Sequence, residues 1–236
     1  MLGLVARRVD VLQALADNLR ASDPDTRIFC YPLDVTDERA LHDAAQDFLA
    51  QAGVPDIVIA SAGVSSGTLT ENAGDLATIR RIFAINVHGL IATFSPFIAD
   101  MQRAAQGGKK TGRLVGIASV AGIRGLPGAG AYSGSKSAVI TYLESLRLEM
   151  RASGLKVVTI APGYIATPMT AINTYSMPFL MPAEQAAPLF AQAIEHGASY
   201  VVIPWPMGLV AKLLRLLPNW LFDRLFAKAP RKSRVL

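Results

Sequence analysis

The sequence contains a single cysteine, Cys30, so no disulfide can form within the chain. Charged residues are also scarce, at 17% of the 236 residues, whereas 51% are hydrophobic. A disordered chain has the opposite balance, so the sequence predicts a folded protein whose length suits one domain. Cys30 lies in the apolar stretch Ile28 to Tyr31, which indicates a buried, unreactive thiol.

The sequence also lacks a secretory signal, an uninterrupted apolar run of membrane-spanning length and a block of basic residues. Met1 to Ala6 is apolar but too short for a signal, and Arg7 and Arg8 follow it rather than precede it. The net charge of +5 is spread along the chain, which argues against a nucleic-acid partner. We expect a cytoplasmic protein without a metal site that binds phosphate-bearing small molecules.

Short apolar runs alternate with longer helical segments throughout the chain. Most of the runs are continuously apolar, as in parallel strands that are covered on both faces. The alternation predicts a three-layer α/β fold with a Rossmann-type, doubly wound parallel sheet over residues 1–206. The expected strands are Leu2–Ala6, Arg27–Tyr31, Ile57–Ala60, Leu114–Ala118, Lys156–Ile160 and Tyr200–Ile203. The expected helices are Val9–Ala21, Asp37–Gln51, Asp75–Ala105, Ala131–Ala152 and Pro182–His196.

The strongest chemical signal is Tyr132-Ser133-Gly134-Ser135-Lys136, in which the tyrosine and the lysine share one face of a helix. A free tyrosine has a pKa near 10, too high for efficient proton transfer at neutral pH. A nearby cation would lower that pKa, so the pair predicts an acid/base tyrosine. The spacing alone also suits an ordinary surface pair.

Small and polar residues follow three of the predicted strands. Ser119 comes directly after the strand that ends at Ala118, and its hydroxyl could hydrogen-bond a substrate carbonyl. Ser61-Ala62-Gly63 and Pro162-Gly163 follow two other strands at the same edge of the sheet. Ligands of α/β sheets bind at the carboxyl ends of strands, so these residues predict a cofactor groove there.

Six motifs in order give the chain a resemblance to the short-chain dehydrogenase/reductase family. They extend from Leu2 to about Pro204 and leave little room for chance. The motifs are Leu33-Asp34-Val35-Thr36, Ala60-Ser61-Ala62-Gly63, Ile85-Asn86-Val87, Ser119, Tyr132 to Lys136, and Pro162-Gly163-Tyr164-Ile165-Ala166-Thr167.

The resemblance implies a catalytic role for four residues. Tyr132 would be the general acid in carbonyl reduction, and Ser119 would orient the substrate oxygen. Lys136 would lower the tyrosine pKa and hold the nicotinamide ribose, and Asn86 would hold a proton-relaying water. Asn86 also reads as an ordinary buried amide. The resemblance places further residues at the cofactor, namely Asp34 and Val35 at the adenine, Ser61, Ala62 and Gly63 at the adenosine ribose, and Pro162, Gly163, Ile165 and Thr167 at the nicotinamide end. Asp34 could instead hydrogen-bond its own turn.

The end of the first strand indicates which nicotinamide cofactor is used. NAD-selective sites place a carboxylate at this position, but here Arg7 and Arg8 follow Ala6 and the next acid is Asp10. A guanidinium suits the additional phosphate of NADP(H). The sequence therefore predicts NADP(H), with Arg7 and Arg8 at that phosphate.

The chain departs from the family pattern at its beginning. Members carry an N-terminal glycine-rich strand–turn–helix, and that first βα unit is missing here. Its strand would lie centrally, between the second and the fourth, so its loss should open the core. We expect either that the native protein starts upstream of Met1 or that the chain is a damaged fragment.

The second departure is the basic, amphipathic tail, residues 207–236. Leu209, Leu213, Leu216 and Trp220 suggest a broad apolar face, with basic residues interleaved and Pro218 breaking the run. The tail could be a lid or subunit contact, a membrane-surface helix, or a segment packed on its own domain.

The sequence thus predicts an oxidoreductase that transfers a hydride between NADP(H) and a carbonyl or alcohol substrate, and a homo-oligomer. The apolar loop from Tyr164 to Pro182 favours a hydrophobic substrate. The alternative is a non-catalytic, truncated protein of the same fold that serves as a binding or interaction subunit.

Overall fold

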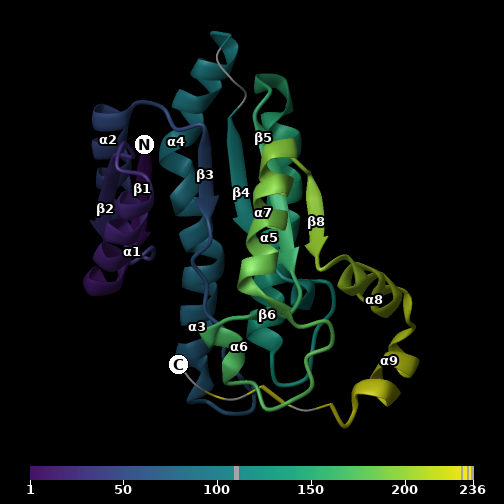
Figure 1. Ribbon diagram of the computed structural model, residues 1–236. Helices are drawn as coiled ribbons and strands as arrows, with labels where there is room; N and C mark the ends of the chain where they lie inside the picture. The colour runs from purple at the N-terminus through teal and green to yellow at the C-terminus, as the bar shows by residue number, and fades with distance from the viewer. Residues whose placement is uncertain (109–111, 230, 233, 235–236) are drawn as a thin grey trace.

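The computed structural model describes residues 1–108, 112–229, 231, 232 and 234 (Figure 1). Apart from the short parallel pair of β6 (Ile165–Ala166) and β7 (Met181–Pro182), it contains two parallel sheets built from six longer strands. One sheet has the order β1-β2 and the other the order β3-β4-β5-β8. Each strand lies within two residues of its predicted range, so the α/β fold is confirmed. The strands are β1 (Leu2–Ala6), β2 (Ile28–Pro32), β3 (Ile57–Ala60), β4 (Arg113–Ile117), β5 (Lys156–Pro162) and β8 (Tyr200–Ile203).

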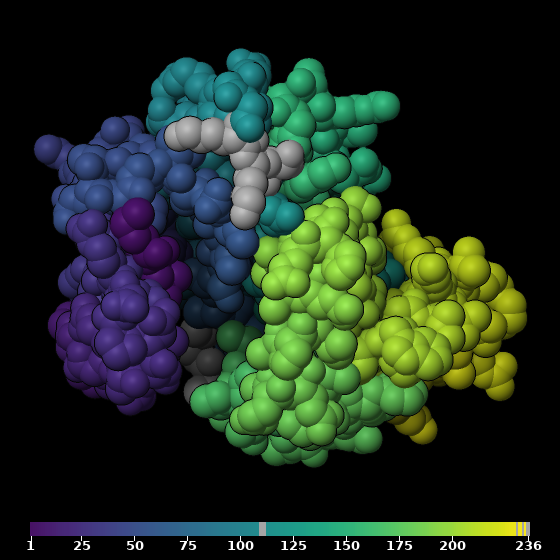
Figure 2. All heavy atoms as spheres, turned by 45° about the horizontal axis from the view of Figure 1, so that its top comes forward, coloured from purple at the N-terminus to yellow at the C-terminus, as the bar shows by residue number. Residues whose placement is uncertain are grey.

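The division between β1 and β3 falls where the missing central strand was expected. No described strand joins the two sheets, and β3 is left with one open edge. Val58 and Ala60 of β3 are buried, but Ile57 and Ile59 on the opposite face are 41% and 48% exposed. The prediction that the strands are covered on both faces is therefore wrong for β3. Figure 2 shows the surface hollowed between the purple N-terminal segment and the yellow-green helix α7 (Ala183–His196).

The helices form the outer layers. The segment predicted as one helix over 75–105 is α3 (Asp75–Phe83) and α4 (Gly89–Gln106), joined by a five-residue π-helix, η1 (Ala84–His88), that contains Asn86. This composite helix, Asp75–Gln106, is long and apolar enough to cross a membrane by length and composition, yet Phe94 and Met101 in it are fully buried in the protein core. The remaining N-terminal and central helices are α1 (Val9–Ser22), α2 (Glu38–Ala52), η2 (Val120–Gly122), α5 (Gly130–Glu149) and η3 (Met150–Ser153).

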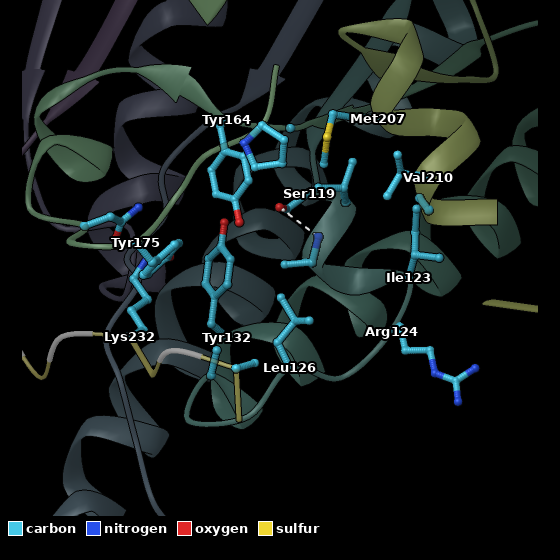
Figure 3. Close-up of a pocket in the computed structure, with 18 of the residues that line it drawn as sticks. Ser119, Ile123, Arg124, Leu126, Tyr132, Tyr164, Tyr175, Met207, Val210 and Lys232 are labelled. Carbon is cyan, nitrogen blue, oxygen red and sulfur yellow. Dashed lines mark hydrogen bonds between the residues drawn. The ribbon is translucent and has the colours of Figure 1, made fainter. Parts of the chain in front are cut away.

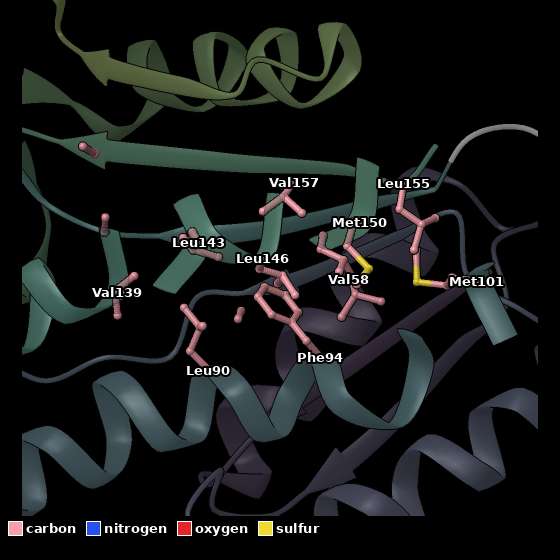
Figure 4. Packing of buried hydrophobic residues seen from close by; sticks show 14 residues of the cluster. Val58, Leu90, Phe94, Met101, Val139, Leu143, Leu146, Met150, Leu155 and Val157 are labelled. Carbon is pink, nitrogen blue, oxygen red and sulfur yellow. The ribbon is translucent and has the colours of Figure 1, made fainter. Parts of the chain in front are cut away.

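The core has two parts because successive strand residues point to opposite faces of the sheet. On one face Leu114 and Val157 pack with side chains of α4 and α5, among them Phe94 and Leu143 (Figure 4). On the other face Val115, Val158 and Ile160 pack with Ile194 of α7. Cys30 of β2 is only half-buried, which corrects the prediction of a buried thiol, because β2 is the outer strand of the smaller sheet.

The C-terminal segment forms two further helices, α8 (Trp205–Leu216) and α9 (Asn219–Phe226), separated at Pro218 as the sequence suggested. Helix α8 begins at Trp205, so the predicted boundary after residue 206 falls in its first turn. Of the predicted tail, residues 230, 233, 235 and 236 lie outside the described part of the chain. The loop before α7 holds β6 (Ile165–Ala166), α6 (Pro168–Ala171) and β7 (Met181–Pro182).

Two leucines of α5 test the packing of the core. Leu143 is fully buried and fits against Gly116 of β4, whereas Leu148 is 59% exposed. Leu143→Ala should lower the free energy of unfolding by about 2–5 kcal/mol, because it leaves a cavity that the sheet cannot close. Leu148→Ala should change it by less than about 0.5 kcal/mol. Equal urea midpoints for the two variants would contradict the packing described here.

Candidate active site

Ser119 and Tyr132 meet at the carboxyl end of the larger sheet. Ser119 follows β4 and caps η2, where its Oγ accepts a hydrogen bond from the backbone N–H of Ala121 at 3.2 Å. The same Oγ lies 3.5 Å from the carbonyl oxygen of Pro162, at the end of β5. Tyr132 stands in the first turn of α5, and its hydroxyl interacts with the Ser119 side chain. The predicted serine and tyrosine are therefore brought together.

Burial, rather than a nearby cation, dominates the electrostatics of Tyr132. Burial raises the pKa of Tyr132, and the hydrogen bond with Ser119 opposes that rise. The ammonium of Lys136 is instead directed to the carbonyl oxygen of Ile117, to which its Nζ donates at 2.7 Å. The expectation that Lys136 lowers the tyrosine pKa is therefore wrong for the chain alone. Burial also lowers the pKa of Lys136, to about 8.

Asn86 joins three segments of the site. Its Oδ1 accepts from the backbone N–H of Val64 at 2.8 Å, and its Nδ2 donates to the Val64 carbonyl and to Ser135 Oγ, both at 3.0 Å. The buried amide thus clamps the loop after β3 to α5, and the role of Asn86 in holding a proton-relaying water stays a prediction. A π-helix adds a residue to the turn, and such turns often mark functional sites.

Gly63 lies against the clamp and the lysine. A Cβ built at this position would lie 3.4 Å from Asn86 Oδ1 and 3.5 Å from Lys136 Nζ, so Gly63 is a direct neighbour of both groups. Ser61 and Ala62, just before it, are exposed at the end of β3. Of the predicted residues after β3, Gly63 therefore borders Lys136.

A cavity of about 370 Å³ opens in front of Ser119 and Tyr132 (Figure 3). Most of its wall is apolar. The loop after β5 contributes Tyr164 and Tyr175, and the C-terminal helices contribute Met207 and Phe226, among others. Lys136 is not among the lining residues, so the site has a substrate side and, behind Tyr132, a second side formed by Gly63, Asn86 and Lys136. The C-terminal helices therefore form part of the cavity wall, and the choice among the roles considered for the tail stays open.

Arg124 holds the tail over the cavity, a role that the sequence did not reveal. Its guanidinium donates to the carbonyl oxygens of Leu214 at 2.9 Å and Leu217 at 2.8 Å, at the end of α8. It also lies 4.1 Å over the ring of Phe222 in α9. The last carbonyls of a helix lack a full set of intrahelical partners, so these two oxygens can accept from the guanidinium. Arg124 is an isolated arginine in a glycine-rich loop, and nothing in the local pattern gave it a partner.

Arg7 has an acidic neighbour that is distant in sequence. Its Nη1 lies 3.5 Å from Oδ2 of Asp34. The expectation that no acidic residue before Asp10 competes for the arginines is therefore wrong in the folded chain, because Asp34 is brought beside Arg7. Burial by itself would raise the pKa of Asp34, but hydrogen bonds from Thr36 and the charge of Arg7 together lower it. Both partners of the pair are substantially exposed, so it stabilises the fold only weakly. Arg8 is exposed at the start of α1 and makes no capping hydrogen bond.

The other predicted cofactor residues fall into two groups. Val35 packs against Gly89 at the start of α4, near Asp34. Pro162 lies beside Ser119, whose Oγ is near its carbonyl oxygen. The next residue, Gly163, lies against Met207 of the tail. Ile165 lies in β6, and Thr167 caps α6 through a reciprocal pair of hydrogen bonds with Thr170.

The described residues fit one end of a nicotinamide dinucleotide. Lys136 offers a buried ammonium with a single described protein acceptor, and Gly63 lies beside it. These groups suit a ribose with its hydroxyls. The described chain supplies no glycine-rich turn for the pyrophosphate.

The parallel sheet, its covering helices and the serine–tyrosine–lysine site define an α/β oxidoreductase. A family model described as short chain dehydrogenase matches residues 2–176. The chain therefore belongs to the short-chain dehydrogenase/reductase family. Two solved structures with a similar fold contain a bound nicotinamide nucleotide.

One relative and two solved structures illustrate the likeness. An uncharacterized oxidoreductase of Myxococcus xanthus is 38% identical over 217 residues, covering 92% of this chain and 83% of the relative. A 3-ketoacyl-(acyl-carrier-protein) reductase from Brucella melitensis complexed with NADH has a TM-score of 0.75 at 19% identity, over 85% of each chain. L-Sorbose reductase from Gluconobacter frateurii, complexed with NADPH and L-sorbose, has a TM-score of 0.73 at 20% identity, over 85% of this chain and 84% of that one. The fold is thus compatible with either nicotinamide cofactor.

The lowered pKa of Lys136 predicts a specific pH dependence of stability. Because the unfolded chain binds this proton more tightly than the folded chain, the charged lysine destabilises the fold below about pH 8. The penalty should be relieved as the pH rises from about 8 toward 10.5. The stability of the native chain should thus rise relative to Lys136→Met by up to about 3 kcal/mol between pH 7 and pH 10, measured by urea unfolding. The same comparison with Lys156→Met, at the exposed start of β5, should show no such trend, and a flat difference for Lys136→Met would contradict the assignment.

Proposed function

We propose that the protein reduces an apolar ketone or aldehyde, or oxidises the matching alcohol, with NADP(H). The observation that carries the proposal is the placement of Ser119 and Tyr132 on the wall of an apolar cavity, with Lys136 and Gly63 directly behind them. A hydroxyl pair that faces an apolar cavity suits a substrate with one polar, reacting oxygen.

The two hydroxyls divide the work on the substrate oxygen. Ser119 donates a hydrogen bond that orients the carbonyl and stabilises the negative charge that develops on its oxygen. The raised pKa of Tyr132 keeps its phenol protonated at neutral pH, so Tyr132 is positioned to donate the proton in carbonyl reduction. Lys136 would compensate the negative charge that develops at the site and would hold ribose hydroxyls behind Tyr132. Asn86 fixes the loop after β3 relative to α5 through its hydrogen bond to Ser135.

The nicotinamide cofactor would supply the hydride and would lie on the side formed by Gly63, Asn86 and Lys136. Pro162, Gly163, Ile165 and Thr167 are assigned to its nicotinamide end by family resemblance. On the same ground, its adenosine end is assigned to Asp34, Val35, Ser61, Ala62 and Gly63.

Removing the phenol hydroxyl tests the mechanism. Tyr132→Phe should lower kcat for carbonyl reduction by roughly a hundred- to ten-thousand-fold, because the general acid is lost. Tyr142→Phe, farther along α5 and outside the site, should retain turnover within about twofold and serves as the matched control. Full turnover by a folded Tyr132→Phe variant would exclude the proposed mechanism.

The choice of NADP(H) rests on Arg7 and Arg8. We assign both guanidinium groups to the additional phosphate of NADP(H), with Arg7 exchanging its weak pair with Asp34 for the phosphate. The double variant Arg7→Ala/Arg8→Ala should lose about tenfold or more in affinity for NADPH and little for NADH, by fluorescence titration. Arg39→Ala, which removes an almost fully exposed arginine, should change neither affinity. A chain that binds neither cofactor although folded would support the non-catalytic alternative.

The cytoplasmic location, the homo-oligomer and the membrane contact stay predictions. The outer sides of α8 and α9 carry exposed Trp205, Leu213, Leu216 and Trp220, with basic residues between them. This apolar surface supports an association of the chain, either with a second copy or with a membrane surface.

A further inference from the structure

The end of the chain returns across the mouth of the cavity. Arg231 lies against Gly128, Lys232 lines the cavity, and Arg234 pairs with Asp75 at the start of α3. Asp75 is itself held in place, because its carboxylate also accepts from the backbone N–H of Leu69 at 2.8 Å. The contacts on either side of Lys232 thus fix this residue at the cavity rather than in solvent.

Lys232 brings a positive charge to the catalytic tyrosine. Its Nζ lies 5.4 Å from the centroid of the Tyr132 ring, and Figure 3 shows it beside Tyr132 and Tyr175. The cation–ring contact is a weak one and does not neutralise the charge. Burial lowers the pKa of Lys232, as expected for an ammonium that has lost water without gaining an acidic partner.

The cavity contains no protein group to balance this charge. Its described lining residues include no Asp or Glu, and no described residue accepts a hydrogen bond from Lys232. The other cation in the lining, Arg124, is engaged by carbonyls of α8, and its guanidinium points away from the cavity. An ammonium in an apolar enclosure attracts an anion, because the pair restores the interaction energy that the charge lost on leaving water.

We propose that Lys232 binds a carboxylate of the substrate, so that the enzyme acts on keto acids or the corresponding hydroxy acids with an apolar body. One ammonium balances one carboxylate, whereas a phosphate monoester would leave excess negative charge in the enclosure. Since the ammonium lies over the Tyr132 ring, the acid and the reacting carbonyl are separated by only a few bonds. This inference rests on the proposed function and narrows its substrate class.

Benzoylpropionate and its methyl ester form a matched pair of probes, because they share the aryl ketone and differ only in charge. Calorimetry should show that the native chain binds the acid more tightly than the ester. Lys232→Met should weaken binding of the acid by about tenfold or more and leave the ester within about twofold, as expected for the loss of one charge-assisted hydrogen bond. Lys232→Arg should retain most of the affinity, and Lys228→Met, which removes an exposed lysine of the same segment, should bind both probes like the native chain.

Binding and turnover together separate this inference from the proposed function. Acid-selective binding that depends on Lys232 supports the inference even if neither probe is reduced, in which case the proposed function fails alone. Turnover of both probes with equal KM in the native chain and in Lys232→Met supports the function and overturns the inference. Three further results would overturn the inference. These are an equal loss of affinity for acid and ester in Lys232→Met, no binding of the acid to the native chain, and a loss of affinity in Lys232→Met that is confined to NADPH.

Discussion

The hydrogen bonds of the Asn86 amide are the constraint on which the site depends. They join the loop after β3, through Val64, to α5, through Ser135. Because Ser135 lies between Tyr132 and Lys136 on α5, the clamp sets the position of both chemical groups relative to the end of β3. A buried amide whose oxygen and nitrogen both have partners strongly favours one arrangement of those partners, and here they come from two separate segments. Loss of these hydrogen bonds would let the loop after β3 move relative to α5 and would separate Gly63 from Lys136. The groups behind the serine–tyrosine pair would then no longer be held together.

The clamp divides the site into two halves with different physical character. Behind Tyr132 lie the buried ammonium of Lys136 and the neighbouring Gly63, where the ammonium suits a hydroxyl-rich group. In front lies the apolar cavity, whose wall is completed by α8 and α9 and fixed by the hydrogen bonds of Arg124. The tyrosine stands between the halves and keeps its proton, because burial raises its pKa. The chemistry thus depends on a tail that lies far from the family motifs in sequence.

Much of the fold and the main members of the site could be predicted because their signals are local. The apolar runs of β1, β3 and β8 end at their observed boundaries, and the i, i+4 spacing of Tyr132 and Lys136 places both on α5. The remainder depends on contacts between distant segments, which no local pattern encodes. Examples are the approach of Asp34 to Arg7, the direction of the Lys136 ammonium to Ile117, and the return of Lys232 to Tyr132. The exposed face of β3 was missed for a related reason, since an apolar run gives no information about which helix covers it.

The central claim is that the chain transfers a hydride to a carbonyl carbon held by Ser119 and Tyr132. The most direct test is to incubate the folded chain with NADPH that carries deuterium on the transferable position and with benzoylpropionate methyl ester. Mass spectrometry of the products would then follow the label. Our account predicts deuterium on the new carbinol carbon, one atom for each NADPH oxidised. Unchanged ketone and unoxidised NADPH, or an alcohol without the label, would contradict the account.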